Sequence, residues 1–261
     1  MWPSFARSRI TVKSVVALLL TFTAGIVDIV GYISLYHIFV AHMTGVTVHL
    51  GNKLAVGDGA DAMKYASVLL GFVAASVLGR VIIEAGARTH RRTVATITLI
   101  SESILILLFM WAGHSIVLAI PQGSVPLRTI CSLLALLAAA MGLQTATLTR
   151  IGPLTIHTTF VTGMLNKFAQ SFSQWIFWLH DNWRRHTLAN AFHSSARHPA
   201  LRNAQLMLTI WFAYVIGSVA GTWMNSKWSL GALYVPVFLL LVSAALDQFR
   251  PLSLEEEQDQ I

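Results

Sequence analysis

Charged residues are scarce in this chain of 261 residues. Asp, Glu, Lys and Arg together make up 11% of it, whereas 55% of the residues are hydrophobic and the mean hydropathy is +0.65. A soluble domain carries about 25% charged residues, so this chain has too few of them to cover a water-facing surface. Its apolar runs of about 20 residues are long enough to cross a bilayer as helices. The composition therefore predicts an all-α integral membrane protein with about six transmembrane helices.

Cysteine is almost missing as well. Cys131 is the only one, which excludes an intramolecular disulfide. The net charge of +7 does not indicate a nucleic-acid partner, because the basic residues lie at the ends of apolar runs, where they set orientation. The sequence also lacks the nucleophile elbow, the zinc-protease motif and the glycine-rich phosphate loop. We therefore expect a non-enzymatic protein without a cofactor, whose main partner is the lipid bilayer.

The apolar runs divide the chain into two units of three spans. A cytoplasmic N-terminus (1–14) precedes the first unit (15–112), an external loop (113–127) follows it, and an acidic tail (250–261) follows the second unit (128–249). A polar insert (181–203) lies inside the second unit. The expected spans are 15–36, 63–86, 93–112, 128–148, 204–225 and 229–249. Lys and Arg concentrate on one side of these spans, which places both termini in the cytoplasm.

Each unit contains one apolar segment that a Thr-Gly pair interrupts. The first (37–56) carries Thr44-Gly45, and the second (154–178) carries Thr162-Gly163. In both, Asn-Lys, an apolar residue and Ala follow a few residues later. If both segments crossed the membrane completely, the basic loop 88–92 would fall outside, so we interpret them as broken or re-entrant. Interrupted segments at matching places in two halves are typical of transport sites.

The repeat extends beyond these segments. Gly25-Ile-Val-Asp28 opens the first unit as Gly142-Leu-Gln144 opens the second, and Ser76-Val-Leu-Gly79 matches Ser218-Val-Ala-Gly221. Because each unit holds an odd number of spans, the second is inverted relative to the first. The sequence thus predicts two inverted three-helix repeats.

Several of these motifs resemble one bacterial family. Gly25-x-x-Asp28, Phe39-Val-Ala-His-Met-Thr-Gly45, Met141-Gly-Leu-Gln144 and Val161-Thr-Gly163 are similar to motifs of the YoaK family of bacterial inner-membrane proteins, over nearly the whole chain. The family is largely uncharacterised, so the resemblance implies about six helices and an inner-membrane location but no reaction. The sequence departs from the family pattern at Val46, where an asparagine is usual.

Two acidic residues lie inside expected spans. A charge at the centre of a bilayer costs at least about 2.5 kcal/mol, so intramembrane acids are functional by default. We predict that Asp28 and Glu102 couple transport to protons. The alternative is that each acid is hydrogen-bonded to a neighbouring helix or lies nearer the membrane surface.

The remaining candidate residues gather around the Thr-Gly pairs. These pairs are expected to end half-helices and to expose backbone groups to a solute, since glycine tolerates a broken backbone; the alternative is close helix packing through small residues. His42 titrates in the range that suits a pore-lining or proton-relay role. A metal site is not expected, because further ligands at suitable spacing are missing. The predicted substrate-binding residues are Asp28, His42, Thr44, Gly45, Gln144, Thr162 and Gly163.

These features predict a transporter or channel for an unidentified small solute or ion, coupled to protons through Asp28. A membrane scaffold or assembly protein is the alternative, and an intramembrane enzyme using Asp28 and a histidine comes third. The small-residue faces of the second and fifth spans are compatible with a homodimer. Such a dimer would be disrupted by Gly79→Leu or Gly221→Leu.

Overall fold

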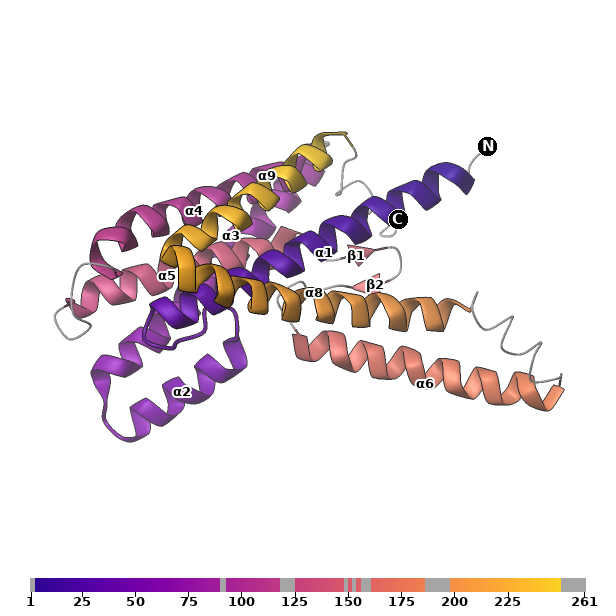
Figure 1. The fold of residues 1–261 in the computed structure, drawn as a ribbon, viewed down its shortest axis with the longest axis horizontal. Coiled ribbons are helices and arrows are strands. Elements are labelled where there is room, and N and C mark those ends of the chain that lie inside the picture. The colour runs from indigo at the N-terminus through magenta and orange to yellow at the C-terminus, as the bar shows by residue number, and fades with distance from the viewer. Residues whose placement is uncertain are drawn as a thin grey trace.

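The computed structural model describes residues 3–89, 93–117, 125–147, 150–151, 154–155, 161–185 and 198–249. They form long helices and one short β-hairpin (Figure 1). In chain order these are α1 (Pro3–Ser34), α2 (Met43–Ala55), α3 (Gly59–Arg88), α4 (Val94–Val117), α5 (Leu127–Thr147), β1 (Arg150–Ile151), β2 (Leu154–Thr155), α6 (Val161–Arg185), α8 (Pro199–Trp228), η1 (Ser229–Leu233) and α9 (Tyr234–Phe249). The prediction of a helical membrane fold is confirmed.

Five stretches of the described residues are long and apolar enough to cross a membrane. They are Lys13–Ser34, Gly59–Arg88, Val94–His114, Leu127–Thr147 and Pro199–Phe249. The last has 51 residues and contains α8, η1 and α9. Figure 1 shows that the chain reverses direction between α8 and α9, where Ser229 adopts a left-handed φ of 49°. This stretch is therefore bent into two helices.

α2 and α6 are not among these apolar stretches. α2 has 13 residues and is therefore about 20 Å long, which is shorter than the hydrocarbon core of about 30 Å. α6 has 25 residues and is strongly amphipathic. It continues beyond the expected end of the second segment at residue 178 and into the expected polar insert, which α8 also shortens by starting at Pro199. In Figure 1 the two helices extend towards opposite ends of the molecule.

The largest helix–helix contacts join α3 to α5 and α1 to α8, and both depend on glycine. Gly25 on α1 lies against the carbonyl oxygen of Tyr214 on α8, and Gly142 on α5 lies against that of Phe72 on α3, so an added methyl group would overlap each oxygen. A serine completes each contact. Ser218 Oγ donates to the Gly25 carbonyl oxygen at 3.4 Å, and Ser76 Oγ donates to that of Gly142 at 3.2 Å.

Gly79 and Gly221 lie in the same two contacts, one turn further along. A Cβ on Gly79 would approach the Ala146 side chain to 2.8 Å, and one on Gly221 would approach Ile29 to 2.6 Å. The expectation that these two glycines face another copy of the chain is therefore wrong, because each faces a helix of its own chain.

Candidate functional site

The site begins where α1 ends. Tyr36 and His37 have left-handed φ angles of 54° and 58°, which turn the chain back before α2 begins at Met43. The returning backbone lies beside α1, and the amide groups of Val40 and Ala41 donate to Asp28 Oδ1 at 3.0 and 3.1 Å. Asp28 thus holds the interruption between two helices in place.

The second carboxylate oxygen of Asp28 has two further donors. The Tyr214 hydroxyl on α8 donates to Oδ2 at 2.7 Å, and His42 Nδ1 lies 2.7 Å from the same oxygen. Only 2% of the Asp28 side chain is exposed. Both oxygens meet donors, which is how a buried carboxylate is compensated. We call Asp28, His42, Tyr214 and the amide groups of Val40 and Ala41 the Asp28 cluster.

His42 connects this buried acid to the surface. Its side chain is 43% exposed, and its ring lies 4.7 Å from that of Phe39 and 6.3 Å from that of Tyr214. Phe39 in turn stacks on Tyr32 at 4.4 Å. Because Nδ1 binds Asp28, the other ring nitrogen remains to bind a proton or a ligand. The cluster therefore places a half-exposed imidazole next to a buried carboxyl group.

The Thr-Gly pairs lie in the first turns of helices. Thr44 and Gly45 belong to the start of α2, and Thr162 and Gly163 to the start of α6. Of the two helix ends that the expectation left open, both pairs stand at the amide end, where the first backbone N–H groups lack helical partners. Thr44 and Gly45 are exposed, and no atom lies within 4 Å of a Cβ built on Gly45. Close packing within the described chain does not explain this glycine.

Two predicted residues lie elsewhere in the bundle. Gln144 on α5 is buried, and its Nε2 donates to the carbonyl oxygen of Leu20, two turns before Asp28 on α1. Glu102 on α4 is also buried, and neither of its carboxylate oxygens has a partner among the described residues. The structure thus brings Asp28 and His42 together, with Thr44 and Gly45 on the following turn, and leaves Glu102 outside this cluster.

Tyr214 was not among the predicted site residues. It stands 186 positions from Asp28, so local spacing gives no signal for the contact. A weak signal did exist: Tyr214 lies one helical turn before Ser218 and two before Gly221, on the face that the repeat motif marks.

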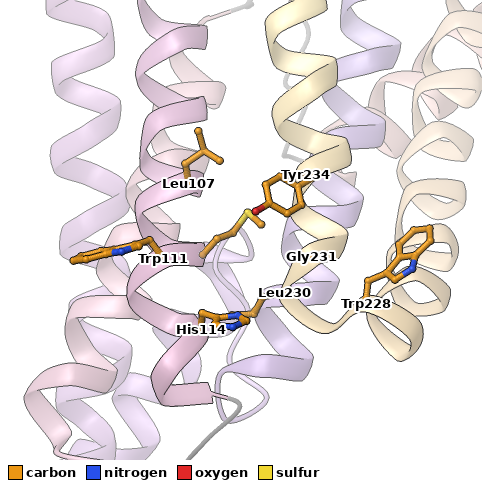
Figure 2. Close-up of a pocket in the computed structure, with 8 residues that line it drawn as sticks. Leu107, Trp111, His114, Trp228, Leu230, Gly231 and Tyr234 are labelled. Atoms are coloured by element: carbon orange, nitrogen blue, oxygen red, sulfur yellow. The ribbon is translucent and has the colours of Figure 1, made fainter.

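Among the described residues, no group of three His, Cys, Asp or Glu side chains could hold a metal ion. One pocket of about 620 Å³ lies between the end of α4 and the start of α9, and none of the predicted site residues lines it. Figure 2 shows Tyr234 between Trp111 and Trp228, which lie on opposite sides. Aromatic residues of this kind are typical of the membrane–water boundary.

The turn between α2 and α3 is charged. Lys53 Nζ lies 2.9 Å from Asp58 and 2.7 Å from Asp61, and Lys64 lies 2.8 Å from Asp61. The Lys53 ammonium, with the amide group of Asp61, holds the pKa of Asp58 below its usual value, and the two carboxylates raise the pKa of Lys53. These ion pairs tie the end of α2 to the start of α3.

Comparisons with known proteins give one family. Residues 16–246 match the family described as "Protein of unknown function (DUF1275)". The chain is 31% identical over 161 residues to the UPF0700 transmembrane protein YoaK of Bacillus subtilis (strain 168). The aligned region covers 61% of this chain and 67% of that protein. No solved structure matches the chain.

Proposed function

Because the chain belongs to this DUF1275 family of membrane proteins, whose function is unknown, we propose that it is a transporter or channel for a small solute or ion. We propose further that Asp28 and His42 couple the passage of this solute to protons, in the inner membrane of a bacterium. The observation that carries the proposal is a buried carboxylate that fixes a broken helix and shares an oxygen with an exposed histidine.

This arrangement supports transport because it links charge to backbone position. If His42 or Asp28 changes its protonation state, the hydrogen bonds of Oδ2 change, and the segment that leads into α2 loses or gains an anchor. An ionisable residue at membrane depth is otherwise a costly element of a helical bundle. A protein that only packs helices has no need of a half-exposed histidine at this position.

The paired contacts support an inverted repeat of three spans. The contact of Gly25 with the Tyr214–Ser218 turn and that of Gly142 with the Phe72–Ser76 turn each place a glycine against the carbonyl oxygen of an aromatic residue and a serine one turn later. Equivalent helices are then α1 and α5, α2 and α6, α3 and α8, and α4 and α9. A pseudo-two-fold axis in the membrane plane would direct α2 and α6 towards opposite surfaces, in agreement with their directions in Figure 1.

Six crossings then follow from the five apolar stretches, since the last one is bent into α8 and α9. The end of α3 with Arg88 and the start of α8 with Arg202 would lie on the cytoplasmic side together with both termini. The charged turn between α2 and α3 would face the opposite side.

A flux assay on the purified full chain tests the proposal. The protein is reconstituted in liposomes that contain a pH-sensitive dye, and proton movement is recorded while a panel of small cations, anions and neutral solutes is applied in turn. We expect at least one solute to drive proton flux in wild-type liposomes and Asp28→Asn or His42→Asn to abolish that flux. His49→Asn is the matched control, because His49 is on α2 but stacks on Tyr65 at 5.2 Å, outside the Asp28 cluster.

Thr162→Val tests the second half in the same assay. Lost flux with wild-type expression and folding in both Asp28→Asn and Thr162→Val would support transport through the two segments. Folded wild-type protein that moves neither protons nor any solute of the panel would contradict the proposal. It would favour the alternative that the chain is a membrane scaffold or assembly protein. Loss of folding alone would mean that the segments serve packing.

A further inference from the structure

One face of α6 is apolar and has no cover within the described chain. The seam of α6 consists of Leu165, Ala169, Phe172, Ile176, Leu179 and Trp183, of which Leu179 is half-buried and the others are exposed. Four of these side chains are large and between 37% and 52% exposed. The intervals between successive members are four, three, four, three and four residues, so that the seam forms one stripe along the helix with the alternating spacing of coiled-coil contact positions.

The seam is distinct from the face that binds α6 to its own chain. Met164 and Ser171 are buried against the neighbouring helix α8, and Trp178 stacks on His198 at the start of α8, with 4.4 Å between ring centroids. At 100° per residue these residues lie on one side of α6, and the seam begins about 60° further round. The seam is therefore a second packing surface.

Lipid does not provide a suitable cover for this surface. α6 is not among the membrane-spanning candidates. Phe177 is exposed beside the seam as well, but the sector that contains it is otherwise polar and leaves Asn166, Gln170, Ser173 and Gln174 exposed. Such side chains are expensive in the hydrocarbon core, where they find no water. α6 runs alongside α8 (Figure 1), which belongs to a stretch long and apolar enough to cross the bilayer. We therefore do not expect α6 to lie flat on the membrane surface either.

We propose that the seam binds the α6 helix of a second copy of this chain. Two copies in one membrane with the same orientation are related by a two-fold axis along the membrane normal. Such an axis places the two α6 helices parallel and in register, so that each seam residue meets its own counterpart. The seam itself contains no charged residue, so no like charges meet within it. It is flanked by Asn166, Ser173 and Asn182, and by His180, whose Nδ1 lies 3.5 Å from Asp181 on the same helix. This interface does not depend on transport.

Cysteine cross-linking in native membranes tests the geometry. Cys131 is first replaced by serine, and single cysteines are then introduced as Ala169→Cys and Ile176→Cys in the seam. Gln170→Cys and Gln174→Cys are the matched controls in the polar sector of the same helix. We expect oxidation to convert most of each seam variant to a covalent dimer and to yield about tenfold less for the controls, because control residues point away from the axis.

A charge in the seam tests its energetic contribution. Ile176→Lys should weaken dimerisation of the full chain in lipid nanodiscs by at least about tenfold, whereas Gln174→Lys, with the same added charge, should leave it unchanged. Dimer formation is measured by single-molecule photobleaching, which requires only folded protein in the nanodisc. Because the cysteine variants add no charge, they still decide the question if Ile176→Lys fails to fold.

Three results would overturn the proposal. One is a monomeric wild-type protein without cross-linking at Ala169→Cys or Ile176→Cys. Another is equal cross-linking at seam and control positions, which indicates random collision. The third is that Ile176→Cys is protected from a water-soluble maleimide by phospholipid even in nanodiscs with a single copy, which would mean that the seam lies on the membrane.

Discussion

The two halves of the chain share the glycine contacts between their helices but differ in the side chains beside these contacts. In the first half, Asp28 on α1 binds the backbone before α2 and the side chains of His42 and Tyr214. In the second half, the paired glycine contacts place Thr145 of α5 at the position equivalent to Asp28 and Phe72 at the position equivalent to Tyr214. Neither Asp28 nor the Tyr214 hydroxyl that donates to it thus has a chemical equivalent at the matching position of the second half.

This difference separates residues that pack the helices in both halves from residues that anchor the chain in the first half. The bundle requires the glycine contacts in both halves, because they set the distance between α1 and α8 and between α3 and α5. The charged anchor, in contrast, occurs only in the first half of the part of the chain that the structure describes. In the proposed inverted repeat, two-fold symmetry therefore applies to the packing of the helices and not to the residues of the Asp28 cluster.

The largest expected effect is the loss of that anchor. Asp28→Val leaves two amides, a phenol and a histidine without their buried acceptor, and we expect it to lower the free energy of unfolding by about 3–5 kcal/mol. Thr145→Val, the equivalent change in the second half, removes the bond from Thr145 Oγ1 to the Met141 carbonyl oxygen and should cost at most about 1 kcal/mol. Denaturant unfolding in detergent micelles measures both; equal losses would contradict the asymmetry.

Substitution of the glycines in the two largest helix–helix contacts, Gly25 and Gly142, should lower stability to a similar extent in the two halves. Gly25→Ala and Gly142→Ala each push a methyl group into a backbone carbonyl of the facing helix, and we expect each to destabilise the protein by about 1–3 kcal/mol. Gly45→Ala is the control, since open space surrounds this glycine. The same unfolding assay applies, and a large effect at only one of Gly25 and Gly142 would argue against the repeat.

Glu102 should behave in the opposite way to Asp28. Its carboxylate is buried with no partner among the described residues, so Glu102→Leu removes an uncompensated polar group and should raise the free energy of unfolding by about 1 kcal/mol. If proton flux is lost in this variant while stability rises, Glu102 has the coupling role that its place in an apolar helix predicts. A marked loss of stability would instead reveal a structural partner.

The sequence predicted most of the spans because long apolar runs depend only on composition. The run at 128–148, for example, agrees with α5 (Leu127–Thr147) within one residue at each end. The ends of α6 were less predictable, because its amphipathic pattern continues through polar residues that suggest a loop. The Thr-Gly pairs pointed to the starts of α2 and α6, but glycine alone does not tell whether a helix begins or ends there.

The site was predictable only in part, for a similar reason. Asp28 was identified because an acid in an apolar helix is unusual in itself. Its partners depend on the fold: His42 reaches it across a turn with left-handed residues, and Tyr214 reaches it from another helix. Gly79 and Gly221 show the same limit, since a small-residue motif predicts close packing without identifying the helix it packs against.

The smallest expected effect concerns the charged turn that ends α2. Ionised Asp58 pairs with Lys53, and its pKa is lowered in the folded protein. A lowered acid pKa stabilises the fold above the unfolded value of about 4 and ceases to do so as the pH falls through the folded value. Hydrogen exchange at the end of α2 should therefore be faster, after correction for intrinsic rates, at about pH 3 than at about pH 6. Lys53→Met should reduce this difference, and an unchanged difference in that variant would show that other groups hold the end of α2.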